Sequence, residues 1–156
     1  MRTESMRGVL TFGMVAVVSA GTALAQGVAP LLTADQVVAT RKAGMNLQAG
    51  NLIAMKQAVE AGTDVKPLTG SAKSLAGWAR VIPTVFPAGT EAAGATKARP
   101  EIWSDRAGFE RASANFLAQA DKLTQLADAN DKAGFAAQYT ATTQACGACH
   151  RSYQVR

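Results

Sequence analysis

Helical periodicity recurs four times in this chain and constrains its fold more than any other feature. Between residues 33–62, 65–82, 104–128 and 131–156, apolar residues return every three or four positions. This spacing places them on one face of a helix. β-Branched and aromatic residues never alternate over a useful length, so strands are not expected. The sequence therefore predicts an all-α fold.

Local signals set the ends of the first two helices. Thr33 and Gln36 match a capping box at the start of the first helix, which we expect to stop near Gly62. The second helix runs from about Val65 and ends at Pro83, because proline disfavours helical geometry in the residue before it.

A long connection and a short turn separate the remaining helices. Residues 83–104 are punctuated by proline and glycine and predict an irregular loop. The third helix begins at residue 104 or 105, and the fourth follows a turn over residues 128–131. Four helices with three connections favour an antiparallel up-down-up-down four-helix bundle with a long loop between helices 2 and 3.

Each predicted helix carries an inward stripe, and polar residues interrupt the first one. We expect Gln48 at an edge of the bundle, with its amide in water. Arg41 is costly on such a stripe unless its charge is paired or its head reaches solvent. The four stripes contain Val38, Met45, Leu52, Met55 and Val59; Leu68, Ala72, Leu75, Ala79 and Ile82; Phe109, Ala112, Phe116, Ala120 and Leu123; and Phe135, Tyr139, Thr142, Cys146, Cys149 and Tyr153.

The first 25 residues have the pattern of a cleaved secretory signal peptide. Arg2 and Arg7 precede the apolar run 9–18, and small residues end at Ala25, predicting cleavage before Gln26. The run is shorter than the roughly 20 residues that span a bilayer. We therefore expect residues 26–156 to form one exported, periplasmic domain that is not held in the membrane.

The charge of this domain is mild and dispersed. It contains 14 basic and 10 acidic residues, a net charge of +4, and the lysines and arginines are scattered along the chain. Nucleic-acid binding requires a basic patch or stripe. We therefore expect no nucleic-acid partner.

The sequence Cys146-Gly147-Ala148-Cys149-His150 is the C-x-x-C-H signature of c-type haem attachment. On a helix, residues three and four apart lie on neighbouring turns of one face. Two thiols at this spacing can reach the two vinyl groups of one porphyrin while the imidazole reaches the iron. The pattern predicts one covalent haem c, held by Cys146 and Cys149, with His150 as the axial iron ligand.

Three other uses of the two cysteines are less favoured. A disulfide across two residues within a helix is strained. A thioredoxin-like pair lies at a helix start after a strand, whereas this motif closes a helical chain. A structural zinc site needs about four ligands, and the chain supplies two cysteines and one histidine.

The composition limits what can occupy the second axial position of the iron. His150 is the only histidine, so Met, Lys, water or nothing remains, and only Met45 and Met55 remain as methionines after signal cleavage. On periodicity alone, Met45 is a core residue rather than a ligand. Arg41 lies one turn before Met45, where it can pair with haem propionates or reach solvent.

Three separated motifs resemble the cytochrome c′ family, the class II c-type cytochromes. They are Phe86-Pro87-Ala88-Gly89-Thr90, then Ala98-Arg99-Pro100-Glu101-Ile102-Trp103-Ser104-Asp105, then the C-x-x-C-H motif followed by Tyr153. The resemblance implies a left-handed bundle, a periplasmic location and a homodimer. It also implies that Arg41 and Met45 match a family pair beside the distal haem face. The family commonly has a basic residue where this chain has Gln154, and Arg151 or Arg156 can substitute.

Two functions remain open, and a third is disfavoured. The protein can be an electron carrier between redox partner proteins, with Met45 as sixth ligand. It can instead be a five-coordinate protein that binds nitric oxide or carbon monoxide, with Met45 only crowding the site. We expect no enzyme, because peroxidase chemistry needs a distal acid or base and the first-helix stripe supplies neither.

Overall fold

The computed structural model describes residues 32–155, and this part of the chain is helical apart from its connections. The predicted signal peptide lies outside the described residues. Four long helices are joined by shorter helical turns. The long helices are α1 (Ala34–Ala61), α2 (Thr69–Val81), α4 (Arg106–Asp128) and α5 (Lys132–Tyr153). The short elements are η1 (Lys66–Leu68), η2 (Ile82–Val85) and α3 (Glu101–Ser104).

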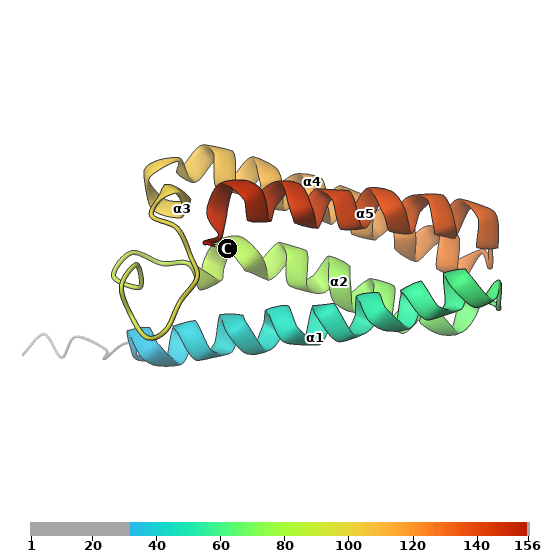
Figure 1. Cartoon of the computed structure of the whole chain (residues 1–156), viewed down its shortest axis with the longest axis horizontal. Coiled ribbons are helices and arrows are strands. Elements are labelled where there is room, and N and C mark those ends of the chain that lie inside the picture. Colours follow the sequence, from blue (N-terminus) through green and yellow to red (C-terminus); the bar gives the residue numbers. More distant parts are fainter. Residues whose placement is uncertain (1–31, 156) are drawn as a thin grey trace, which may run out of the picture.

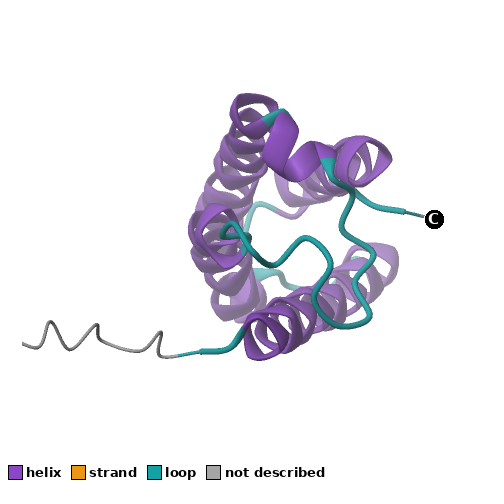
Figure 2. Cartoon of the chain, turned by 90° about the vertical axis from the view of Figure 1, so that its left-hand side faces the viewer, coloured by secondary structure: helices purple, strands orange, loops and turns teal. Residues whose placement is uncertain are grey.

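The long helices run alternately in opposite directions, as the up-down-up-down prediction requires (Figure 1). The connection between η2 and α3 crosses over one end of the bundle (Figure 2). The start of α1 and the end of α5 lie at this same end (Figure 1). The all-α four-helix bundle with a long second connection is therefore confirmed.

The helix ends follow the predicted caps, with three differences. Thr33 and Gln36 form the capping box, and Gly62 ends α1 with a left-handed φ of 62°. The second helix begins as the separate turn η1. Pro83 does not stop the helical path, because the chain continues through it as the 3-10 turn η2. An extra turn, α3, forms inside the predicted loop.

The predicted stripes form the core, with one correction on α1, and one of the two alternatives for Arg41 is excluded. Gln48 is only 8% exposed and accepts hydrogen bonds from Asn51 Nδ2 (3.0 Å) and Ser74 Oγ (3.4 Å), so its prediction as a solvated edge residue is wrong. Arg41 is 3% exposed, which excludes a head group in solvent. None of the helices between residues 32 and 155 is long and apolar enough to cross a bilayer.

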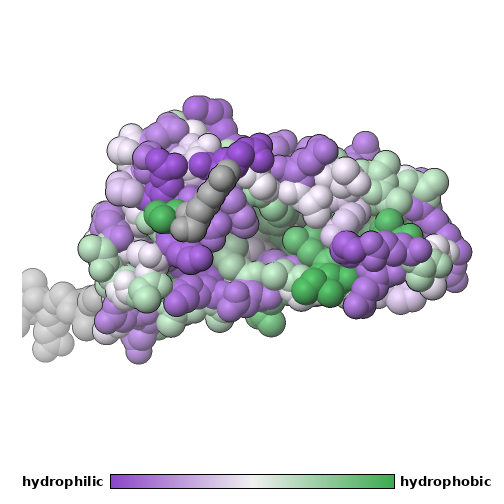
Figure 3. All heavy atoms as spheres, in the orientation of Figure 1, coloured by the Kyte–Doolittle hydropathy of each residue, from purple (hydrophilic) through white to green (hydrophobic). Residues whose placement is uncertain are grey.

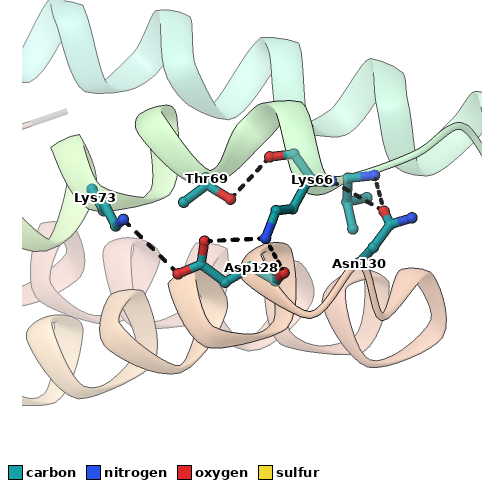
Figure 4. Close-up of polar contacts among 6 residues, drawn as sticks. Lys66, Thr69, Lys73, Asp128 and Asn130 are labelled. Atoms are coloured by element: carbon teal, nitrogen blue, oxygen red, sulfur yellow. Dashed lines mark hydrogen bonds and ion pairs between the residues drawn. The ribbon is translucent and has the colours of Figure 1, made fainter.

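A polar cluster closes the far end of the bundle (Figure 4). The Asn130 carboxamide oxygen accepts hydrogen bonds from the backbone N–H groups of Val65 (2.9 Å) and Lys66 (3.1 Å). Lys66 and Lys73 each form an ion pair with Asp128. The cluster fastens the turn before α2 to the end of α4.

Candidate functional site

The last turns of α5 carry the C-x-x-C-H residues. Cys146 and Cys149 are free, half-buried and packed against the hydrophobic core. The two cysteines therefore do not form the disulfide that was considered as an alternative. Burial raises the pKa of the Cys146 thiol to about 11 and also raises the pKa of Cys149. Both thiols are protonated at neutral pH, and both lie on one face of α5 at helical spacing.

His150 follows Cys149 directly and is an exposed residue. Although it is exposed, the groups around its ring desolvate it and lower its pKa. The neutral imidazole, which is the form that ligates metals, is thereby favoured. Within residues 32–155, no three His, Cys, Asp or Glu side chains form a group that could hold a metal ion by themselves.

Met45 lies half-buried on α1 and contacts Trp78 of α2. The indole N–H of Trp78 donates a hydrogen bond to the Met45 sulfur at 3.4 Å. The ring of Trp78 lies directly on Gly44, because a Cβ built there would be 2.1 Å from the indole Cη2. Met45, Cys146 and Cys149 therefore pack against the same core from two helices.

Arg41 is buried without an ion pair among the described residues. Its guanidinium donates hydrogen bonds to the Thr90 hydroxyl (3.1 Å) and carbonyl (3.4 Å) and to the Thr96 hydroxyl (2.8 Å). It also lies over the Phe86 ring, 4.5 Å from the centroid. Burial lowers the pKa of Arg41. Neutral oxygens and an aromatic face thus stabilise this buried cation.

The seam between α1 and α5 is hollowed and apolar. α4 packs closely along both α2 and α5, whereas α1 approaches α5 along far fewer positions. Figure 3 shows hydrophobic side chains gathered in the hollow between α5 and α1. Half-buried apolar residues on these two helices are Met45, Leu52, Val59, Tyr139, Cys146 and Cys149.

These residues fit a covalently bound porphyrin. The donor set is two free thiols one helical turn apart and an adjacent imidazole, on the helix that borders the hollow. An apolar seam suits the faces of a haem, and a buried guanidinium with further N–H donors suits its carboxylates. No hydrogen bond or ion pair joins Arg41 or Met45 directly to His150 within residues 32–155.

Sequence reasoning missed the partners of Arg41 and Met45. Thr90 and Thr96 belong to the long connection, and Trp78 lies on α2, a different helix from Met45. The spacing of polar residues along one helix cannot show that Arg41 will bind Thr90, which lies 49 residues further along the chain. The motif Phe86–Thr90 was the available signal, because two of its residues contact Arg41.

Comparison with known proteins identifies the family. The family model described as Cytochrome C′ matches residues 36–154. A cytochrome c′ from Rubrivivax gelatinosus is 38% identical over 71 residues, which is 46% of this chain and only about half, 55%, of that protein. Cytochrome c-556 from Agrobacterium tumefaciens (strain II Chrys) is 29% identical over 119 residues, 74% of this chain and 95% of its own length.

Solved structures agree with this match. The crystal structure of cytochrome c′ from Rubrivivax gelatinosus has a TM-score of 0.72 at 26% identity, over 78% of this chain and 97% of that one. A nitric oxide complex of a variant cytochrome c′ from Alcaligenes xylosoxidans has a TM-score of 0.73 at 28% identity, over 81% and 100%. The chain therefore belongs to the cytochrome c′ family of haem c-type cytochromes.

Proposed function

We propose that this chain is a periplasmic class II c-type cytochrome that exchanges electrons with redox partner proteins. One haem would be bound covalently through Cys146 and Cys149, with His150 as axial iron ligand. The observation that carries the proposal is the pair of free, half-buried thiols on α5, packed against the hydrophobic core and directly followed by an imidazole. The bound haem would supply an iron that cycles between two oxidation states.

The surrounding residues suit an electron carrier. Burial and hydrogen bonding are the means by which a protein sets the potential of a haem. The apolar side chains of α1 and α5 would exclude water from the haem faces, and Arg41 would offer its remaining N–H donors to the propionates.

Met45 is the residue that we propose as sixth ligand. Its thioether lies half-buried in the apolar seam, and the N–H···S contact with Trp78 is a weak one that a stronger bond can replace. The other methionine, Met55, is fully buried in the core. It therefore provides a matched control for any effect of losing a thioether.

Gas binding is the second candidate function. The related cytochrome c′ from Alcaligenes xylosoxidans was solved as a nitric oxide complex. If Met45 keeps its hydrogen bond to Trp78 instead of bonding to iron, the sixth position stays open for nitric oxide or carbon monoxide. Met45 would then limit access by its bulk.

Covalent attachment is tested on the exported, matured protein. In alkaline pyridine, the denatured protein should show the spectrum of a c-type haem that acidified organic solvent does not extract. Cys146→Ser and Cys149→Ser should each leave one thioether bond and a shifted spectrum. A porphyrin that extracts fully from the unaltered protein would overturn the proposal.

The sixth ligand is tested by replacing each methionine with leucine. If Met45 ligates the iron, Met45→Leu should convert a low-spin ferric spectrum to a high-spin one, while Met55→Leu should leave it low-spin. If the unaltered protein is already high-spin and binds carbon monoxide rapidly when reduced, Met45 is not a ligand and the gas-binding function is favoured.

Location and assembly complete the proposal. Mass spectrometry of the periplasmic fraction should give a chain beginning at Gln26 and carrying one haem.

A homodimer is supported by Leu47 and Ile53, which are 69% and 59% exposed on α1. Sedimentation velocity should give twice the monomer mass, and a concentration-independent monomer would refute the dimer.

A further inference from the structure

The long connection between α2 and α4 joins α1 to the end of α5. We infer that Thr96 is a positioning residue that sets the width of the α1–α5 seam at the end of the bundle where His150 lies. We call the segment from Phe86 to Arg99 the strap. The inference goes beyond the proposed function, because it assigns a role to a residue that would not touch the haem iron.

The strap is fastened to α1 by two side chains. Arg41 donates to the Thr96 hydroxyl at 2.8 Å, and the neighbouring Lys42 donates to the Ala95 carbonyl at 3.2 Å. Gly94 lies close to the first turns of α1, since a Cβ built there would be 3.5 Å from both Asp35 and Val38. The strap therefore follows the position of the N-terminal half of α1.

The strap is fastened to α5 by backbone bonds just beyond His150. Arg99 N–H donates to the Tyr153 carbonyl at 3.0 Å, and Val155 N–H donates to the Lys97 carbonyl at 2.8 Å. These bonds surround an antiparallel bridge between Ala98 and Gln154. Tyr153, Gln154 and Val155, three to five residues beyond His150, are thus joined to the strap.

Thr96 joins these two attachments through one atom. Its hydroxyl oxygen accepts hydrogen bonds from both Arg41 (2.8 Å) and the Ala98 backbone N–H (3.0 Å), and Ala98 pairs with Gln154. Thr90 also binds Arg41, but none of its hydrogen bonds reaches the segment that pairs with α5. Thr96 is therefore the residue whose side chain joins Arg41 of α1 to the segment that pairs with α5, beside the Lys42 bond to Ala95.

The opposite end of the seam is closed differently. Lys132, the first residue of α5, donates to the Gly62 carbonyl at 3.4 Å and forms an ion pair with Asp64 at 2.9 Å, directly after α1. Between the two ends α1 and α5 approach each other along few positions. Loss of the Thr96 hydroxyl should therefore loosen one end of the seam, where the Lys42 bond to Ala95 remains, and leave the other end closed.

The first test measures backbone protection and does not require the proposed haem function. In Thr96→Val, which keeps the side-chain shape, amide hydrogen exchange of Arg99 and Val155 should become about tenfold faster. Thr96→Ser, which keeps the hydroxyl, should exchange like the unaltered protein. Thr124→Val is the matched control, because its half-buried hydroxyl bonds only within its own helix. Unchanged exchange in a folded Thr96→Val protein would overturn the inference.

The second test measures access to the seam in the haem-loaded, reduced protein, and this arm rests on the proposed function. Carbon monoxide should bind several-fold faster to Thr96→Val and Thr96→Ala than to the unaltered protein, at equal resistance to urea, while Thr96→Ser and Thr124→Val should not differ from it. Equal rates in all variants would refute a role in seam width. If the chain carries no haem, the proposed function fails and the exchange measurement still decides the inference.

Discussion

Gly44 determines how closely α1 and α2 approach beside Met45. The indole of Trp78 occupies the space where a side chain at Gly44 would begin, 2.1 Å from its ideal Cβ position. This contact brings the indole N–H within 3.4 Å of the Met45 sulfur. Gly50, on the same helix, has nothing within 4 Å of its ideal Cβ position. One glycine of α1 is thus required for packing, and the other is not.

Alanine at these two positions should have opposite effects on stability. Gly44→Ala forces the indole away and should lower the free energy of unfolding by about 1–3 kcal/mol. Gly50→Ala should raise it by about 0.5–1 kcal/mol, because alanine favours the helix and meets no neighbour. Denaturant unfolding measures both values. Equal effects at the two positions would show that Trp78 does not rest on Gly44.

At the scale of helices and loops, the sequence predicts what local chemistry determines. The capping box at Thr33 and the left-handed end at Gly62 depend on residues within one turn, and both form as expected. The turn η2 passes through Pro83 because Arg106 of α4 donates to the Pro83 and Phe86 carbonyls. The spacing of residues along the chain gives no sign of this tertiary contact. The sequence therefore did not predict the turn.

In the candidate site, too, local spacing determines some features and tertiary contacts determine others. The C-x-x-C-H motif spans about one helical turn, and the half-buried placement of Cys146 and Cys149 on α5 agrees with the predicted periodicity. Arg41 was predicted to need a partner, yet its partners are two threonines from a loop that the sequence describes only as irregular. A local pattern thus predicts the need for a partner, and only the fold identifies it.

The junction of α4 and α5 gives a pH-dependent prediction. The Tyr153 hydroxyl donates to Asp105 Oδ2 at 2.8 Å. This hydrogen bond, with a second one from the Gly108 backbone N–H, lowers the pKa of Asp105. Because the folded-state pKa lies below the unfolded value, the stabilisation is complete at neutral pH. It is lost as the pH falls below the ordinary value of 3.8 and through the folded-state pKa.

Removal of the tyrosine hydroxyl should reverse part of this shift. In Tyr153→Phe the pKa of Asp105 should rise toward its ordinary value, as measured by carboxyl-carbon NMR titration. The acid loss of stability attributable to Asp105 should become smaller. Tyr139→Phe is the control and should leave the pKa of Asp105 unchanged. An unchanged pKa in Tyr153→Phe would mean that the Gly108 N–H alone holds the carboxylate ionised.

Asn130 connects two elements at the far end of the bundle (Figure 4). It has a φ of 54° and accepts two backbone hydrogen bonds from the turn before α2. Asn130→Gly keeps the backbone conformation but loses the acceptor, and should lower the free energy of unfolding by about 1 kcal/mol. Asn130→Ala adds left-handed strain of about 1–2 kcal/mol. Asn115→Ala, at an exposed site, should change it by less than about 0.5 kcal/mol.

At the scale of the whole molecule, the four long helices are not held equally. α4 packs closely along α2 and α5, and its buried residues include Phe109, Phe116 and Leu123. On α1, Met45, Leu52 and Val59 are only half-buried, although they lie on its inward stripe. Apolar area removed from water stabilises a helix in proportion to its extent. α1 therefore gains most from a large apolar group bound between α1 and α5.

Loss of the attached haem should consequently loosen α1 before the other helices. In the exported double variant Cys146→Ser/Cys149→Ser, most helical circular dichroism should remain, because α2, α4 and α5 keep their mutual packing. Amides of α1 should exchange at least about tenfold faster than in the haem-loaded protein, and those of α4 should change much less. Exchange measured by mass spectrometry resolves the two helices. Equal acceleration in α1 and α4 would show that the bundle opens as one unit and that α1 has no special dependence on the haem.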